Sequence, residues 1–378
     1  MASGESTKKK VLVVGPIPPP FGGIATVIDS ITNSELSHDF SFDLFNRSES
    51  LYEPGSSSVQ RHMLKIQRSL SLFKTCWSGG YDFIHLHGST SGFLNDTLVM
   101  IILWFARAKI LLHLHGTDWD KFYGSVSWFR RLYVRIGLSI PKRIIVLYEL
   151  WAKNIRKINS KIDVRVIRNF VPDCPRPNDT MVQELRTRLG IDSQEFVISS
   201  IGRVGWRKGS FDIVEAATEL VSTDSGFQIL LVGGQEKEGE MDQLQKFVLE
   251  KGMGKWVKLV GEVDIQAVPL FLELSDIFVL PSYYEGMPMS IIEAMRSGKP
   301  IISTHVGAIP DMLESGVSGI LISPGSPGEI ANSIHMLKND PFFRENIATQ
   351  ARRAFETGFE TSRVLSNLRM LYQEMITS

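Results

Sequence analysis

Residues 277–295, IFVLPSYYEGMPMSIIEAM, decide the fold. The segment begins with four apolar residues, Ile277–Leu280, passes through a turn with proline and glycine, and continues into an apolar helical stretch. A short apolar run without alternation predicts a strand buried on both faces, which is typical of parallel sheets. Strand, turn and helix in this order predict one repeating unit of an α/β sheet.

The same alternation of strand and helix extends over the chain in both directions. Strands are predicted at residues 11–14, 83–86, 110–114, 143–147, 164–167, 196–201, 228–232, 257–260, 277–280, 300–303 and 320–322. Residues 171–178, VPDCPRPN, carry three prolines without hydrophobic periodicity and predict a linker. We therefore expect two doubly wound, Rossmann-like domains, residues 1–170 and 179–360, that face each other across a cleft. Residues 361–378, with apolar side chains at helical spacing, predict a closing helix.

Composition supports a two-domain globular protein and hides a charge asymmetry. The chain has 378 residues, of which 43% are hydrophobic, and a net charge of zero. Residues 1–170 hold 22 Lys and Arg against 13 Asp and Glu, whereas residues 171–378 hold 19 against 28. A basic half is thus joined to an acidic half, and this balance, without a recognised motif, argues against nucleic-acid binding.

Two features bear on the compartment. The only cysteines, Cys76 and Cys174, form no disulfide framework, which fits a reducing, cytoplasmic compartment. The longest apolar run, residues 98–106, is too short for a bilayer core that needs about 20 residues. It predicts a buried helix, with a role at a membrane surface as the alternative.

Two glutamates follow the strand at 277–280. Glu285 precedes the predicted helix, where a carboxylate is favoured by the helix dipole, and Glu293 lies within it. A carboxylate among apolar residues is costly unless it finds hydrogen-bond donors, and sugar hydroxyls are good donors. The alternative is a helix-capping glutamate and an ion pair at the edge of the core.

Glycine turns follow two other strands. Arg203 and Lys208 lie in the turn GRVGWRKG after residues 196–201, and cations that precede a helix favour an anionic ligand over a purely stabilising role. Gly22 and Gly23 end the loop after the first strand and permit close approach of a phosphate. The alternatives are a solvated basic loop and a tight turn without ligand. The loop after the first strand does not read GxGxxG, which disfavours a dinucleotide cofactor.

These motifs, in this order, resemble the large family of retaining GT-B glycosyltransferases, of the family 4 type, that includes glycogen-synthase-like and bacterial polysaccharide enzymes. Glu285 and Glu293 match its E-x7-E signature, Arg203 and Lys208 its diphosphate clamp, and PFGG at residues 20–23 its glycine loop. The resemblance covers nearly the whole chain. Ala308 and Asp311 depart from the family pattern, where a second glycine and a glutamate are usual.

The resemblance implies a role for each matched residue. It implies that Glu293 binds the ribose hydroxyls of the nucleotide and that Glu285 binds the hydroxyls of the transferred sugar. Backbone N–H groups around Gly286, Met287, Pro288 and Met289 would hold the sugar and the distal phosphate. Arg203 and Lys208 would neutralise the leaving diphosphate, with Gly22 and Gly23 beside it. No metal or other cofactor is implied, because the cations take the place of a metal.

Histidines follow two strands of the first half. His115, in HGTD at residues 115–118, matches a family histidine that faces the donor sugar. His85 with His87, and His113 with His115, form two HxH pairs that permit a zinc site. No carboxylate or cysteine accompanies them at motif spacing, so we expect these histidines to line a cleft or to fill the core.

The predicted activity is a retaining hexosyl transfer from a UDP- or GDP-linked sugar to a glycan or lipid-linked acceptor, in polysaccharide or glycoconjugate synthesis. Basic amphipathic stretches at residues 65–74 and 128–135 suggest peripheral contact with the anionic inner face of a membrane, against the alternative of ordinary solvated helices. Other functions remain open: a nucleotide-sugar epimerase or hydrolase, or a non-catalytic nucleotide-sugar-binding module of the same fold.

Overall fold

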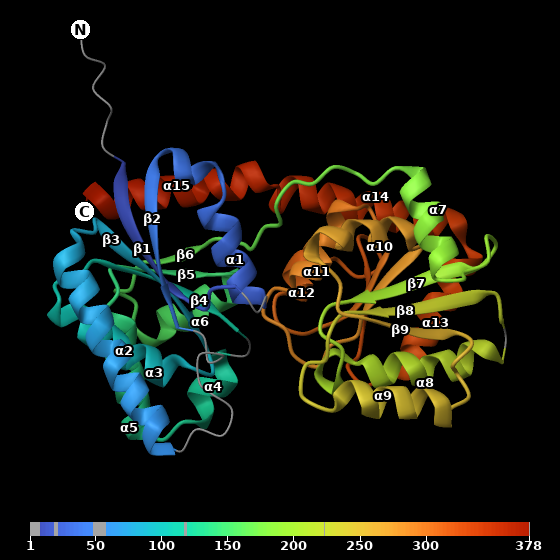
Figure 1. Ribbon diagram of the computed structural model, residues 1–378, viewed down its shortest axis with the longest axis horizontal. Coiled ribbons are helices and arrows are strands. Elements are labelled where there is room, and N and C mark those ends of the chain that lie inside the picture. The colour runs from blue at the N-terminus through green and yellow to red at the C-terminus, as the bar shows by residue number, and fades with distance from the viewer. Residues whose placement is uncertain (1–7, 19–21, 48–57, 117–118, 223, 378) are drawn as a thin grey trace, which may run out of the picture. The chain divides into compact units, whose positions relative to one another are not determined.

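The computed structural model describes residues 8–18, 22–47, 58–116, 119–222 and 224–377. Pro20, Phe21, Thr117 and Asp118 of the quoted motifs lie outside these ranges. The chain divides into two compact units, Met1–Pro172 with Thr361–Ser378, and Asp173–Glu360. The closing helix thus belongs to the first unit, which the sequence did not indicate (Figure 1).

The first unit is built on a six-stranded parallel sheet with the strand order β2-β1-β3-β4-β5-β6. Its strands are β1 (Lys9–Gly15), β2 (Phe40–Asn46), β3 (Phe83–Ser89), β4 (Ile110–His115), β5 (Arg143–Val146) and β6 (Val164–Val166). Its helices are α1 (Gly23–Thr32), η1 (Glu35–His38), α2 (Ser58–Gly79), α3 (Phe93–Phe105), α4 (Trp119–Ser125), α5 (Trp128–Ser139), α6 (Glu149–Ile158) and α15 (Thr361–Thr377).

The second unit has its own six-stranded parallel sheet, in the order β12-β11-β10-β7-β8-β9. Its strands are β7 (Phe196–Ile201), β8 (Phe227–Val232), β9 (Val257–Gly261), β10 (Ile277–Leu280), β11 (Ile301–Thr304) and β12 (Ile320–Ile322). Its helices are α7 (Asp179–Arg188), η3 (Trp206–Lys208), α8 (Ser210–Val221), α9 (Glu240–Glu250), η4 (Ile265–Ala267), α10 (Val268–Leu274), α11 (Met289–Arg296), α12 (Ile309–Met312), α13 (Pro327–Asn339) and α14 (Pro341–Gly358).

The central strands are buried on both faces, as their unbroken apolar sequences predict. All four residues of β10 are buried, and β8 is buried over its whole length. Helices such as α8 and α13 cover the second sheet with apolar side chains, so its core is one continuous cluster around Ile198, Ile229 and Val279. In the first unit, α15 buries Val364, Leu365, Leu368, Leu371, Tyr372 and Met375.

The predicted environment of the helix at residues 98–106 is wrong. The apolar run at residues 98–106 does form a helix, α3, but Leu98, Trp104 and Phe105 are each more than half exposed. Only one side of this helix therefore lies in the core. Within the described residues, no helix combines the length and the apolarity that a membrane span requires.

Each sheet has one point where the chain changes its winding direction. In the second sheet it lies between β7 and β10, and in the first between β1 and β3. Ligands of open α/β sheets bind beyond the carboxyl ends of the strands at such points. The segments after β7 and β10 hold Arg203, Lys208 and Glu285, and the helix that follows the second segment, α11, holds Glu293.

Candidate active site

Gly209 allows the loops after β7 and β10 to approach each other. Its φ of +72° lies in the left-handed region, and a Cβ there would lie 2.3 Å from the carbonyl oxygen of Pro281. Any other residue would clash with this backbone atom. The backbone N–H of Tyr283 donates to the carbonyl of Arg207 at 2.8 Å and fixes the two loops together. The turn predicted from its glycines thus carries Lys208 to the end of β10.

Lys208 and Glu285, predicted separately, meet at this point. Lys208 Nζ lies 2.5 Å from Glu285 Oε1. Ser282 Oγ donates to the same carboxylate oxygen at 2.8 Å. Glu285 is only 6% exposed, so its charge depends on these partners for compensation. The pair places one cation and one carboxylate, which can accept hydrogen bonds from hydroxyl groups, at the switch point of the sheet.

Arg207 is the residue of this site that the sequence did not assign a role. Its guanidinium is ion-paired with Glu236, donates to the carbonyl of Tyr284 at 2.7 Å, and lies 3.7 Å from Glu285. Arg203, which was assigned to the clamp, lies beside the carbonyl of Gln235 at 3.5 Å. Two cations, Lys208 and Arg207, therefore surround Glu285, and Arg203 contacts the neighbouring loop.

The backbone at Gly286 is held by the loop that follows β11. The N–H of Ala308 donates to the carbonyl of Gly286 at 2.8 Å. Gly307 has a φ of +57°, and a Cβ on it would lie 1.9 Å from the carbonyl oxygen of Glu285. This contact requires glycine at residue 307. The backbone held in this way continues through Met287 and Pro288 to Met289, the first residue of α11. Residues 286–288 therefore precede a helix N-terminus, which attracts anions.

Glu293 lies on α11 with buried neighbours on both sides, Ile292 and Ala294. Burial raises the pKa of its carboxyl to about 7, and the nearby charge of Arg296 opposes this effect. Its carboxylate makes no hydrogen bond within the described part of the chain. A partly buried carboxyl without donors is poised to accept hydrogen bonds from a ligand.

The predicted residues of the first unit lie at or beyond the carboxyl ends of β1 and β4. Gly22 is the N-cap of α1 and Gly23 its first residue, and a Cβ on either would meet no described atom within 4 Å. His115 ends β4 and is buried, with Nε2 3.0 Å from Nδ1 of His87. Burial lowers the pKa of His115 to about 3, so its imidazole is neutral. The structure thus places His115 as a neutral hydrogen-bonding group held by a second histidine.

Sequence reasoning missed Ser282, Glu236 and the role of Arg207. Ser282 is fully buried and directs its hydroxyl at Glu285. Glu236 follows β8, on a loop that carries no motif of its own. Arg207 and Lys208 share one short 3-10 turn, η3, and only the turn geometry shows that both face Glu285. The signal for Ser282 was its place directly after a buried strand, where parallel sheets collect functional residues.

Residues 181–354 match the family described as "Glycosyl transferases group 1". Alpha-D-kanosaminyltransferase of Streptomyces kanamyceticus is 28% identical over 51% of this chain and 49% of that protein, so the alignment spans about half the length of this relative. UDP-Gal:alpha-D-GlcNAc-diphosphoundecaprenol alpha-1,3-galactosyltransferase of Escherichia coli is 26% identical over 84% of this chain and 81% of that protein. The crystal structure of Anabaena HepE in complex with UDP-glucose has a TM-score of 0.77 at 18% identity, covering 97% of this chain and 99% of that chain.

These matches confirm two predictions. The chain has a two-domain α/β fold of the GT-B class, as the similarity to HepE and the two parallel sheets show. Residues 181–354 of its second unit match the glycosyltransferase group 1 family, and relatives that match the chain are named glycosyltransferases, so the prediction of a glycosyltransferase is confirmed.

Proposed function

We propose that this glycosyltransferase moves a sugar from a nucleotide-sugar donor to a glycan or lipid-linked acceptor, with retention of the anomeric configuration. The observation that carries the proposal is the contact of Lys208 with Glu285 at the switch point of the second sheet. A cation for a phosphate and a carboxylate for sugar hydroxyls are the two groups that recognition of a nucleotide-sugar requires.

The donor would be held in three parts. Glu293 accepts hydrogen bonds from the ribose hydroxyls, Lys208 and Arg203 neutralise the diphosphate, and Glu285 accepts hydrogen bonds from hydroxyls of the sugar. Backbone N–H groups of Gly286, Met287 and Met289 add donors at the start of α11. We favour a UDP-linked donor, because HepE binds UDP-glucose and the galactosyltransferase relative is named for UDP-Gal. A GDP-linked donor is the second candidate.

The reaction breaks the bond between the anomeric carbon and the diphosphate oxygen, and forms a bond from that carbon to the acceptor oxygen on the same face. The acceptor hydroxyl passes its proton to the departing phosphate oxygen. Lys208 stabilises the negative charge that develops on this oxygen, and no enzymic base is required. The proposed roles of His115, at the donor sugar, and of Gly22 and Gly23, at the diphosphate, rest on the family resemblance.

The product distinguishes the alternatives. A thermal-shift screen of UDP-, GDP- and ADP-sugars identifies the donor, because a ligand that binds only the folded chain raises its Tm. Incubation of that donor with membrane extracts as acceptor source should then yield a glycosylated product. Free sugar alone would indicate a hydrolase and epimerised donor an epimerase. Binding without any turnover would indicate a non-catalytic module, and stabilisation by none of the donors would overturn the proposal.

Three helices of the first unit carry an unusual number of exposed apolar side chains. α3 packs against both α2 and α5 (Figure 1). Their exposed large apolar residues, which we call the apolar surface, are Met63, Ile66, Leu70, Trp77, Leu98, Trp104, Phe105, Trp128, Phe129, Leu132 and Ile136. Exposed cations, among them Lys74, Arg107, Arg130 and Arg135, are interspersed. Aromatic and cationic side chains together suit an anionic lipid surface.

We propose that the apolar surface docks the chain on the inner face of an anionic membrane, where a lipid-linked acceptor resides, and that the chain is otherwise cytoplasmic. Both cysteines are free, in accord with a reducing compartment. The double variant Trp128→Ser/Phe129→Ser should lose most co-sedimentation with vesicles of phosphatidylcholine and phosphatidylglycerol. Phe342→Ser, which changes an 83% exposed side chain of the second unit, is the matched control. No sedimentation of the unaltered chain at low salt would refute the docking.

A further inference from the structure

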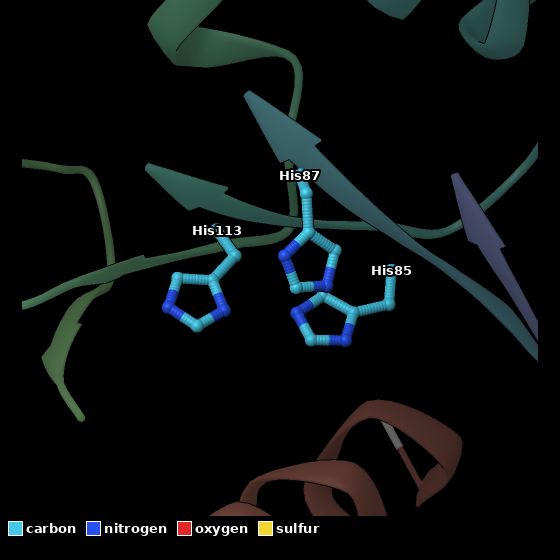
Figure 2. Close-up of side chains that lie close together, drawn as sticks. All are labelled: His85, His87 and His113. Atoms are coloured by element: carbon cyan, nitrogen blue, oxygen red, sulfur yellow. The ribbon is translucent and has the colours of Figure 1, made fainter. Parts of the chain in front are cut away.

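Three buried histidines of the first unit converge on one point. His85 and His87 lie two residues apart on β3, so both side chains project from the same face of the sheet. His113 on β4 is the register partner of His87. The three residues offer ring nitrogens that all lie within 4.8 Å of one another (Figure 2).

The ring planes suit coordination of a shared ion. The planes of His85 and His113 differ by only 5°, with centroids 5.4 Å apart. Figure 2 shows a nitrogen of each ring directed toward the other ring, with His87 beside them. Three imidazole ligands at about 2.1 Å from an ion would be roughly 3.4 Å apart, which small side-chain rotations would reach.

The hydrogen bonds of the cluster leave the converging atoms free. His85 Nδ1 is 2.7 Å from the hydroxyl of Tyr372, and His87 Nδ1 is 3.0 Å from His115 Nε2. Nε2 of His85, Nε2 of His87 and both nitrogens of His113 are buried without a hydrogen-bond partner. His85 and His87 thus have the arrangement usual in metal-binding histidines, in which one nitrogen is oriented by a partner and the other meets the ion, whereas His113 has no orienting partner among the described residues.

The cluster is buried and contains only imidazole groups. All three histidines are at most 2% exposed. A neutral imidazole has one nitrogen lone pair to offer to a metal ion. The histidines form no ion pair with a carboxylate in the part of the chain that the structure describes, so an ion here would keep most of its positive charge.

We propose that His85, His87 and His113 bind a divalent transition-metal ion of the zinc class inside the first unit. Neutral imidazole is a preferred ligand of zinc, and three protein ligands leave one tetrahedral position open. The ion would join β3 to β4 and, through His85 and Tyr372, would stabilise the packing of α15. This site is separate from the donor-binding residues of the second unit, for which the sequence predicted no metal.

The test measures metal in the full-length, untagged chain. Because the three histidines are buried, exchange should be slow, so ZnCl₂ or CoCl₂ is supplied during growth and the metal is measured after gel filtration. We expect one ion per chain, and the visible d–d absorption of tetrahedral Co²⁺ in the cobalt form. The loaded chain should unfold at a Tm higher by about 5 °C than the chelator-treated chain, when free metal stands at about 100 times Kd.

Variants separate a built site from adventitious binding. His113→Gln should remove the metal and the d–d bands, whereas His335→Gln, at an exposed histidine of the second unit, should retain both. Tyr372→Phe removes one oxygen atom and should weaken metal affinity by about 10- to 100-fold, because His85 loses its orienting partner. An unaltered chain that contains no metal after growth in either salt would overturn the proposal. Equal metal content in the unaltered chain and the His113→Gln variant would do the same.

Discussion

Glu293 provides a prediction in which stability and binding move in opposite directions. Its carboxyl pKa is about 7 in the folded chain, against an ordinary value of 4.5, because burial disfavours the charged form. Replacing it by glutamine removes the charge and keeps the shape of the side chain. We therefore expect Glu293→Gln to stabilise the chain at neutral and alkaline pH and to weaken nucleotide binding.

The magnitude follows from the pKa difference. Below pH 4.5 both folded and unfolded states hold the proton, and the shift has no effect on stability. Between pH 4.5 and 7 the unfolded chain releases the proton while the folded chain keeps it, so stability falls as the pH rises. Above pH 7 the loss is constant, at about 3 kcal/mol at most. Between pH 5 and 8 the unaltered chain should lose about 2.5 kcal/mol that Glu293→Gln does not lose.

The assay is urea-induced unfolding of both chains, followed by fluorescence, at pH 5, 6, 7 and 8. The difference in the free energy of unfolding between the two chains is compared across the four pH values. The cost of burying the amide is the same at every pH and does not affect this comparison. Glu184→Gln, at an exposed glutamate of the same unit, is the matched control and should show no such trend. If the difference in the free energy of unfolding between Glu293→Gln and the unaltered chain is constant from pH 5 to 8, the pKa of Glu293 is not raised.

Binding gives an independent readout of the same residue. If ribose hydroxyls donate to Glu293, the nucleotide prefers the ionised carboxylate, and UDP affinity should rise with pH up to about 7 and then level off. Glu293→Gln should bind UDP more weakly and lack this rise. Titration calorimetry on both chains with the same UDP samples cancels the titration of the nucleotide phosphate. Equal UDP affinity in the two chains would remove the ribose role.

Three further predictions concern the loops after β7 and β10. Lys208→Met should lower turnover by about 10²-fold or more in steady-state assays of a folded variant, and turnover within a few-fold would exclude a role in the clamp. Glu285→Gln should lower turnover while UDP affinity, measured by calorimetry, stays within about threefold, because UDP lacks the sugar; a large loss of UDP affinity would contradict the assignment. Gly209→Ala should destabilise the chain in urea by clearly more than Gly190→Ala, which has a similar φ of +61° but no atom within 4 Å of the added Cβ, and equal losses would show that the contact with Pro281 is unimportant.

The strands that the sequence predicted are those whose residues are mostly apolar. Eleven predicted strands correspond to observed ones because most of their residues are apolar, and they include the edge strands β6, β9 and β12. The strand that was missed, β2, reads FSFDLFN and alternates, since it lies at the edge of the first sheet and exposes one face. Continuous apolar runs indicate central strands, and an alternating run of seven residues without flanking turn signals does not stand out.

The candidate site likewise contains residues that the sequence predicted and residues that it did not. Lys208, Glu285 and Glu293 were found because glycines and the E-x7-E spacing mark them. The partners of Glu285 were not found, since Ser282 and Arg207 act through geometry that depends on Gly209 and its contact with Pro281. Side-chain pairing between loops of two strands that are 77 residues apart along the chain leaves no periodic signal in the sequence.

The net negative charge of the second unit and the ion pairs at this site both affect the binding of a diphosphate. Residues 173–360 hold 17 Lys and Arg against 27 Asp and Glu, an excess that repels a diphosphate. Lys208 and Arg207 are moreover already paired with Glu285 and Glu236. A diphosphate that takes Lys208 must therefore displace a carboxylate, and the gain is only the difference between two ion pairs. Glu285 then needs new donors, which the hydroxyls of a transferred sugar supply. Diphosphate and sugar should on this basis bind cooperatively, so an intact nucleotide-sugar satisfies the site better than a nucleotide alone.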